Sequence, residues 1–195
     1  MIIETPRLIL RPFQESDAGD LLEYLAEPAV SCFASMKLNS VDEAKEASRE
    51  RARNPEYYFA ITLKDSGKVI GEIFTCPEDN EAGTGSAEHP DTFSPCWMLN
   101  TAYQKHNYAF EAARAFIDYL FRKKGARRIY AYTEDSNLPG QHLCERLGMR
   151  KEGLFVEFVS FIRNPDGTPR YENTYQYAVL RKEWHCSPES SYTDV

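Results

Sequence analysis

The pattern of hydrophobic and polar positions along the chain predicts strands and helices in a mixed order. Short apolar runs bounded by turn residues predict strands at residues 7–11, 57–63, 69–74, 95–99, 128–133, 154–163 and 171–180. Capping signals and apolar positions at helical spacing predict helices after Ser16 and after Ser40, over 108–124 and over 140–147. This order predicts one α/β (α+β) domain, in which helices flank a mixed central sheet of about seven strands.

Two segments have a distinctly polar composition. Residues 76–93 contain Pro, Glu, Asp, Gly, Thr and Ser with almost no apolar positions, so we expect an exposed loop there. The chain is polar again from Cys186 onward. We therefore expect the domain to span residues 1–185 and a polar C-terminal tail to span residues 186–195.

Charge and cysteine content exclude several classes of protein. The 195 residues carry 23 Lys and Arg against 30 Asp and Glu, and this net charge of -7 argues against a nucleic-acid partner. The 5 cysteines form no C-x-x-C pair and the 4 histidines form no ligand motif, so we expect a cytoplasmic protein without a metal. No apolar run is long enough to span a membrane, and we expect no membrane partner.

The segment from Leu99 to Ala109 joins a predicted strand to the N-terminus of the helix over 108–124. Free backbone amides and a positive dipole end make a helix N-terminus a ready anion site. Asn107 tolerates the left-handed conformation, and Ala109 is small enough for a phosphate to approach the backbone. Further donors are supplied by Gln104, Lys105 and His106. The alternative is an ordinary capped helix with Asn107 as its N-cap, and the residues alone leave both open.

The same segment resembles the Q/R-x-x-G-x-G/A pyrophosphate loop of the GNAT (GCN5-related) N-acetyltransferase superfamily. Gln104, Asn107 and Ala109 occupy the three motif positions, with Asn107 in place of the first glycine. Further segments resemble the ribosomal-protein (RimJ/RimL-type) branch in the same order, at residues 4–13, 137–149, 150–153 and 170–184. The resemblance covers Ile3 to Trp184.

This resemblance implies that acetyl-CoA lies between two splayed strands, one ending at Leu99 and the other over 128–133. The pantetheine arm would pair with backbone groups of Trp97, Met98 and Leu99, like an added strand. The pyrophosphate would be held by the backbone amides of Gln104, Lys105, His106, Asn107, Tyr108 and Ala109. The Asn137 side chain would contact the cofactor arm, and a primary amine would attack the thioester directly.

The resemblance also points to candidate acid and base residues. Relatives often protonate the leaving thiolate with a Ser or a Tyr, and here Gly140 and Cys144 occupy those positions. Cys144 is a candidate proton donor; the alternatives are that it is a small buried hydrophobe and that water supplies the proton. Glu72, on a strand that borders the acceptor cleft in this family, is a candidate general base, with a solvated strand residue as the alternative.

Other residues near the expected reaction centre are Glu134 and Asp135, which follow the strand over 128–133. Tyr130 or Tyr132 is placed to line the acceptor pocket, with ordinary strand packing as the alternative. Aromatic residues along the last two predicted strands suit either a core or the face of a homodimer.

We therefore predict an acetyl-CoA-dependent N-acetyltransferase whose acceptor is a primary amine, either a protein N-terminus or a small molecule. Residues 100–151 carry ten basic and five acidic side chains, although the whole chain is acidic. This asymmetry suits an anionic donor and a cationic acceptor. A non-catalytic acyl-CoA-binding module and an interaction protein on the same fold are the alternatives.

Overall fold

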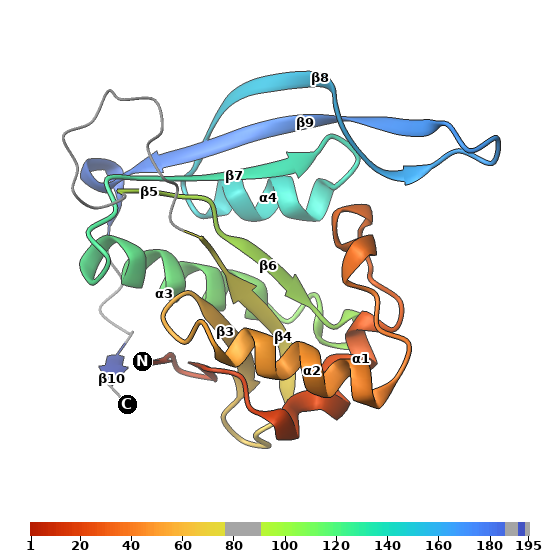
Figure 1. Ribbon diagram of the computed structural model, residues 1–195. Coiled ribbons are helices and arrows are strands. Elements are labelled where there is room, and N and C mark those ends of the chain that lie inside the picture. The colour runs from red at the N-terminus through yellow and green to blue at the C-terminus, as the bar shows by residue number, and fades with distance from the viewer. Residues whose placement is uncertain (77–90, 186–190, 194–195) are drawn as a thin grey trace.

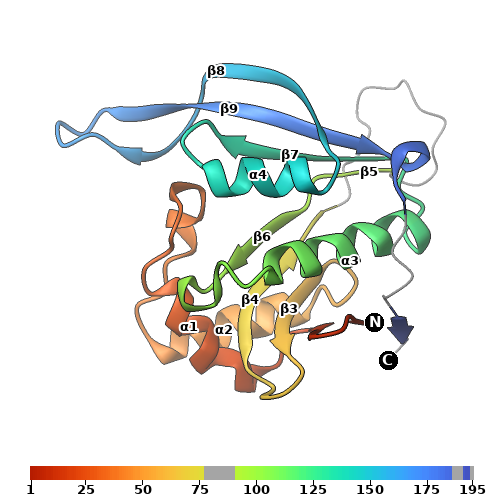
Figure 2. The ribbon, with the colours of Figure 1, turned by 180° about the vertical axis from the view of Figure 1, so that it is seen from behind.

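The computed structural model describes residues 1–76, 91–185 and 191–193 (Figures 1 and 2). Its strands are β1 (Ile2–Glu4), β2 (Leu8–Arg11), β3 (Tyr58–Leu63), β4 (Val69–Phe74), β5 (Thr92–Phe93), β6 (Cys96–Leu99), β7 (Arg128–Glu134), β8 (Arg150–Arg163), β9 (Pro169–Leu180) and β10 (Ser191–Thr193). Its helices are α1 (Ala18–Leu25), α2 (Val41–Ala52), α3 (Tyr108–Arg122) and α4 (Leu138–Arg146). Short 3₁₀ helices are η1 (Glu15–Asp17), η2 (Ser31–Met36), η3 (Thr101–Tyr103) and η4 (Arg181–Glu183).

The described strands form two sheets. One sheet has six strands in the order β10-β1-β2-β3-β4-β6, and the other has four strands in the order β5-β7-β9-β8. In Figure 1 the four-stranded sheet and α4 lie above the six-stranded sheet, and Figure 2 shows the same division from behind. The α/β fold class is confirmed, while the strands divide between two sheets where we expected one.

The chain passes from one sheet to the other between β5 and β6. Thr92 and Phe93 pair in parallel with the start of β7, whereas β6 pairs antiparallel with β4. Pro95 lies between them and has no amide hydrogen, so the ladder with β7 cannot continue through it. β6 therefore diverges from β7, which is the splayed pair that the resemblance implied. The predicted exposed loop is wrong at its end because Phe93 is buried, and its residues 77–90 lie outside the described part of the chain.

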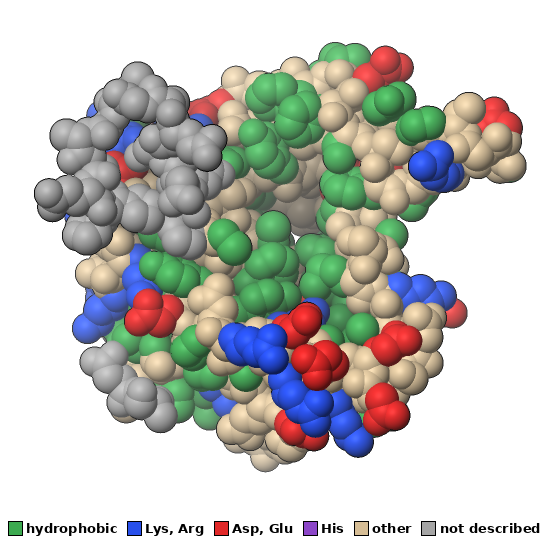
Figure 3. Space-filling view, viewed as in Figure 1, with side chains coloured by type: hydrophobic (Ala, Val, Ile, Leu, Met, Phe, Trp, Pro, Cys, Tyr) green, Lys and Arg blue, Asp and Glu red, His purple; other side chains and the backbone are tan. Residues whose placement is uncertain are grey.

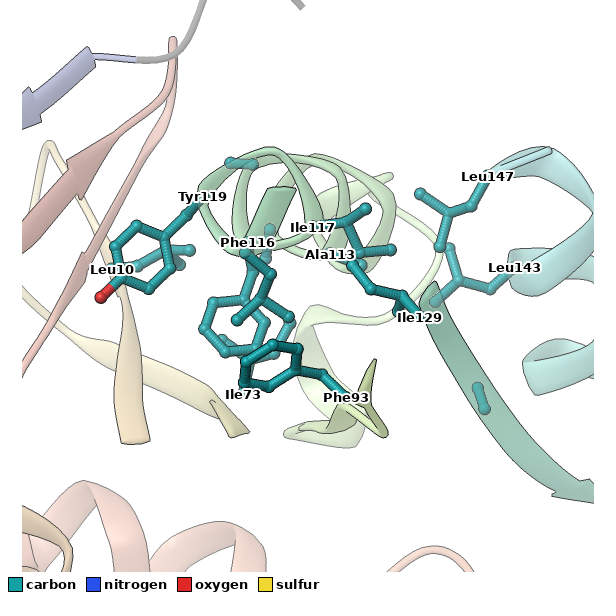
Figure 4. Packing of buried hydrophobic residues seen from close by; sticks show 14 of the residues in the cluster. Leu10, Ile73, Phe93, Ala113, Phe116, Ile117, Tyr119, Ile129, Leu143 and Leu147 are labelled. Atoms are coloured by element: carbon teal, nitrogen blue, oxygen red, sulfur yellow. The ribbon is translucent and has the colours of Figure 1, made fainter. Parts of the chain in front are cut away.

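Helix α3 packs against both sheets, which explains why so many of its side chains are buried. Its N-cap, Asn107, and its last residue, Arg122, are polar, but nine of its residues are buried. Figure 4 shows the side chains of this core, which come from β2, β4, β5, β7, α3 and α4: Leu10, Ile73, Phe93, Ala113, Phe116, Ile117, Tyr119, Ile129, Leu143 and Leu147. The helix thus fixes the position of its own N-terminus relative to β6 and β7.

Helices α1 and α2 cover the face of the six-stranded sheet opposite α3 (Figures 1 and 2). A second hydrophobic cluster forms there around Phe13, Leu21 and Leu25. The Ser40 side chain caps α2 by accepting a hydrogen bond from the Glu43 amide, as the sequence predicted. Although α2 is polar, it buries Arg51 against this sheet.

Two further segments complete the sheets. The segment between α1 and α2 contains η2, which reaches up to β8 (Figure 1). Residues Ser191–Thr193, inside the predicted polar tail, pair with β1 as strand β10. Residues 186–190 and 194–195 of that tail lie outside the described residues.

Candidate functional site

The loop before α3 has an unusual backbone. Asn107 adopts φ 70° and ψ 7°, the left-handed conformation that its residue type tolerates, and Lys105 adopts φ 65°. The His106 ring nitrogen Nδ1 lies 2.8 Å from the Gln104 carbonyl oxygen. The Glu111 amide donates to the Asn107 carbonyl as the helix begins, so the amides of residues 108–110 point out of the first turn. The loop therefore presents a row of backbone donors at the positive end of a fifteen-residue helix.

Arg146 of α4 holds the side chain of Asn107. Its Nη2 donates to the Asn107 Oδ1 over 2.6 Å, and its guanidinium stacks on the Phe110 ring at 4.5 Å. Asn107 is the N-cap residue of α3, as the alternative held, but its side chain makes no capping hydrogen bond. The contact also brings a cation to the mouth of the loop.

Arg7 supports the same loop from the other side. Its guanidinium forms an ion pair with Glu111 at 2.7 Å and donates to the His106 carbonyl over 3.1 Å. It also lies 4.5 Å from the centre of the Tyr108 ring. The loop is thus fixed between the N-terminal strand region and α4.

Among the described strands, β6 pairs on one edge only, and its other edge faces the space between β6 and β7. The paired edge lies against β4, where Leu99 lies opposite Gly71. A Cβ on Gly71 would lie 2.2 Å from the Met98 carbonyl oxygen, so only glycine permits this close approach. Met98 and Leu99 are buried, Trp97 is half-buried, and Gln104 Nε2 lies 3.5 Å from the Leu99 carbonyl oxygen.

A cavity of about 340 Å³ lies where β6 and β7 diverge. Figure 3 shows a hollow lined by hydrophobic side chains between the upper and lower parts of the molecule. The cavity is lined by Phe74 of β4, Pro95, Cys96 and Trp97 around β6, Ala131, Tyr132, Thr133 and Glu134 of β7, Asn137, Gly140 and Cys144 of α4, Phe158, Val159 and Phe161 of β8, Thr174 of β9, and Cys32, Phe33, Ser35 and Met36 of η2. Of the two tyrosines considered from the sequence, Tyr132 lines the cavity.

Glu72 lies apart from this cavity. Its side chain is fully buried, and the Arg51 guanidinium binds both carboxylate oxygens, with Nε–Oε2 at 2.7 Å and Nη2–Oε1 at 3.3 Å. Both expectations for Glu72, a general base and a solvated strand residue, therefore need correction. A solvated strand residue is wrong because the carboxylate has no exposure, and the geometry does not support a general base because both oxygens are already engaged.

Cys144 lines the cavity but is a poor acid. Burial raises the pKa of its thiol to about 12. A thiol of that pKa does not protonate a thiolate whose own pKa is about 8.5. The geometry therefore favours the alternative for Cys144, a small buried hydrophobe on α4.

Asn137 and Gly140 begin α4 at the cavity wall. The Asn137 Oδ1 accepts a hydrogen bond from the Gly140 amide over 3.1 Å, and so caps the helix. A Cβ on Gly140 would lie 2.9 Å from both the Asn137 Nδ2 and the Thr133 Oγ1. A serine at position 140 would therefore require its neighbours to move, which is consistent with the glycine found there.

Sequence reasoning missed two parts of the site. Segment η2 has no regular hydrophobic pattern, and nothing local indicates that it covers the cavity. On β8, the five residues from Phe155 to Val159 lie opposite three residues of β9, Glu172 to Thr174, and Glu157 in this bulge has a φ of 49°. The bulge lies beside Phe158, one of the cavity residues. The one sequence signal for this bulge is the spacing of aromatic residues in the strand, which departs from strict alternation.

Comparison with known proteins identifies the family. Residues 7–150 match the family model described as an acetyltransferase (GNAT) domain, and the chain therefore belongs to the GNAT acetyltransferases. It is 28% identical over 185 residues to YnaD, an uncharacterized N-acetyltransferase of Bacillus subtilis (strain 168), covering 95% of this chain and 100% of that relative. A crystal structure of a GNAT-family acetyltransferase from Bacillus anthracis is 26% identical, with a TM-score of 0.77 over 94% of this chain and 100% of that one.

A more distant likeness concerns a structure that contains coenzyme A. RimL, described as a ribosomal L7/L12 α-N-protein acetyltransferase in complex with coenzyme A, is 14% identical with a TM-score of 0.70. It covers 92% of this chain and 98% of that one. This likeness shows the shared fold, and acetyl-CoA is the donor that the GNAT family uses. Among the residues that the structure describes, no helix is long and apolar enough to cross a bilayer.

Proposed function

We propose that this protein is an acetyl-CoA-dependent N-acetyltransferase that moves the acetyl group to a primary amine. The observation that carries this proposal is the arrangement around the divergence of β6 and β7. A loop of backbone donors at the start of α3 lies at one end, and a cavity with a buried carboxylate, Glu134, lies at the other. The first feature suits an anionic donor, and the second suits a cationic acceptor.

The residues at the divergence fit coenzyme A in type and position. The amides of residues 104–109 would hold the pyrophosphate, because the left-handed Asn107 opens the backbone to it. Arg146 would add a positive charge next to that group. The free edge of β6 at Trp97–Leu99 would pair with the amides of the pantetheine arm. The Asn137 side chain lines the cavity, at the position where the thioester end of the arm would arrive.

The residues around the cavity orient the two reactants. The amine nitrogen forms a bond to the acetyl carbonyl carbon, and the bond from that carbon to sulfur breaks. Neither Gly140 nor Cys144 supplies an acid to the leaving thiolate, so its proton comes from the amine or from water. The protein acts chiefly by alignment, with close placement of the amine as the largest contribution.

The test is acetyl transfer itself. The protein is incubated with acetyl-CoA and a panel of primary amines, free thiol is measured, and coenzyme A binding is measured separately by calorimetry. We expect thiol release with at least one amine and micromolar binding of coenzyme A. Binding without turnover on any amine would favour the non-catalytic acyl-CoA-binding module, and absence of binding would contradict the proposal.

We further propose that the chain belongs to the ribosomal-protein branch of the family, because the segments at residues 4–13, 137–149, 150–153 and 170–184 resemble that branch. Mass spectrometry of a cell extract treated with the protein and labelled acetyl-CoA would identify the acceptor. Membership of that branch does not fix the acceptor, so this search separates the two acceptor classes: labelled protein N-termini would support a protein acceptor, and label confined to small amines would support a small-molecule acceptor.

A further inference from the structure

Glu134 differs from the other buried acidic residues of the described chain. Five such residues are buried: Asp17, Glu72, Asp118, Glu134 and Glu172. Three of them have an arginine partner: Asp17 with Arg11, Glu72 with Arg51, and Glu172 with Arg170. Asp118 accepts a hydrogen bond from the Trp184 indole. For Glu134, by contrast, no Lys, Arg or His nitrogen of the described residues lies within 4 Å of the carboxylate.

The contacts of Glu134 leave its charge without compensation. Glu134 is 6% exposed, and its carboxylate accepts a long hydrogen bond, of 3.4 Å, from Asn137 Nδ2 and another from the Cys32 thiol. Burial and this carboxylate raise the pKa of the Cys32 thiol, which lies beside it on η2. A neutral thiol and an amide are weak partners, and a buried carboxylate without a cation is costly in a folded protein. A cation delivered by a ligand would remove that cost.

Two threonine hydroxyls at the same cavity also have no partner. Thr174 of β9 is the register partner of Glu134, and Thr133 precedes Glu134 on β7. Both are at least nine-tenths buried, both line the cavity, and neither Oγ1 has a hydrogen-bond partner in the described chain. Buried hydroxyl groups are nearly always hydrogen-bonded, so these two indicate a polar ligand group in the cavity.

The remaining wall of the cavity is apolar and aromatic. Phe33 and Met36 of η2 and Phe158 and Phe161 of β8 line it. Tyr132 packs on Phe158 with their ring centres 5.7 Å apart. A ligand that satisfies Glu134 therefore carries a compact apolar body next to its cation, and the cavity volume of about 340 Å³ suits a small molecule.

The geometry points to Glu134 and Thr174 as the pair that binds the acceptor's ammonium group, and to a primary amine on a compact apolar body as the acceptor class. This inference rests on the proposed N-acetyltransferase function. The Glu134 carboxylate first takes one proton from the ammonium, which frees the nitrogen lone pair. The nitrogen–carbon bond then forms and the carbon–sulfur bond breaks. The second nitrogen-bound proton goes to the departing thiolate, and the amide product is neutral.

The test compares Glu134→Gln with a matched control, Glu172→Gln. Glu172 is buried to a similar degree, but its charge is paired with Arg170 and it does not line the cavity. The probes are 2-phenylethylamine, spermidine and a tetrapeptide with a free N-terminal alanine. We expect kcat/KM for 2-phenylethylamine to fall about a hundredfold or more in Glu134→Gln and to stay within about threefold in Glu172→Gln. Coenzyme A affinity should be unchanged in both.

A second variant, Thr174→Val, keeps the test valid if Glu134→Gln fails to fold. Removing an unpartnered buried hydroxyl should leave thermal stability equal or higher, while binding of 2-phenylethylamine to the coenzyme A complex weakens about tenfold. If Thr174 had only a structural role, its substitution would not weaken amine binding while leaving thermal stability equal or higher.

The outcomes distinguish this inference from the proposed function. If the wild type binds coenzyme A and prefers spermidine or the peptide, the acceptor class is wrong and the enzyme function stands. If Glu134→Gln keeps kcat/KM within threefold for every accepted amine, the role of Glu134 is wrong. If the wild type neither binds coenzyme A nor acetylates any amine, both proposals fail together.

Discussion

The buried pair of Arg51 and Glu72 gives the sharpest test of how the structure assigns roles to charged residues. We predict that Glu72→Gln destabilises the protein without impairing the chemistry. The substitution leaves the Arg51 guanidinium charged next to the rings of Phe13 and Tyr58, whose centres lie 5.7 and 5.2 Å from it. Breaking one side of a buried ion pair typically costs about 3–5 kcal/mol. That is a large share of the roughly 5–15 kcal/mol by which a domain is stable.

The assay is urea unfolding combined with steady-state kinetics. With a slope of about 2 kcal/mol per molar urea, the midpoint should fall by about 1.5–2.5 M. The double variant Arg51→Met with Glu72→Met should recover much of the loss, because no unpaired charge remains. The value of kcat, measured well below the unfolding transition, should stay within threefold. Unchanged stability with a hundredfold loss of kcat would refute this reasoning and restore Glu72 as the general base.

Three further predictions concern the cofactor side of the molecule. Gly71→Ala should lower thermal stability by several degrees and reduce coenzyme A binding, because its Cβ would meet the Met98 carbonyl at 2.2 Å; an unchanged melting curve would contradict this. Arg146→Ala should weaken coenzyme A binding about tenfold by calorimetry, since the cation that holds Asn107 is lost, and unchanged affinity would place Arg146 outside the site. Iodoacetamide should alkylate the Cys144 thiol only slowly below pH about 12, and mass spectrometry measures the extent of alkylation. A raised pKa keeps the thiol protonated below that value, and fast reaction at pH 8 would contradict it.

The hydrophobic pattern predicted most elements because strands and helices depend on local spacing. It could not predict the division into two sheets, since that depends on which strands pair at a distance and on the interruption at Pro95. It also gave Glu72 a solvated position, because a glutamate in an alternating strand is usually exposed. Its partner Arg51 lies on a polar helix 21 residues earlier, and sequence alone does not show that the two meet.

The site was predictable where a motif fixes the backbone and unpredictable where three-dimensional neighbours decide. Asn107 was expected to tolerate a positive φ, and the structure has it at 70°. The distinctive property of Glu134 is that no cation of the described residues lies next to its carboxylate, which only the packing of η2, β7 and β9 reveals. The poor acidity of Cys144 likewise could not be predicted from the sequence, because burial in the fold is what raises the pKa of its thiol.

The central claim is that the loop before α3 binds the pyrophosphate of acetyl-CoA, and calorimetric titration of coenzyme A into two variants tests it most directly. Asn107→Gly keeps the positive φ without adding charge and should bind with an affinity close to that of the wild type. Asn107→Glu places a negative charge about 4 Å from the phosphate position, which costs about 4 kcal/mol at an effective dielectric of about 20 before salt screening. We predict at least a hundredfold weaker binding for Asn107→Glu, with a melting temperature lowered by a few degrees because Glu tolerates a positive φ less well than Asn. Equal affinity for both variants would contradict the claim.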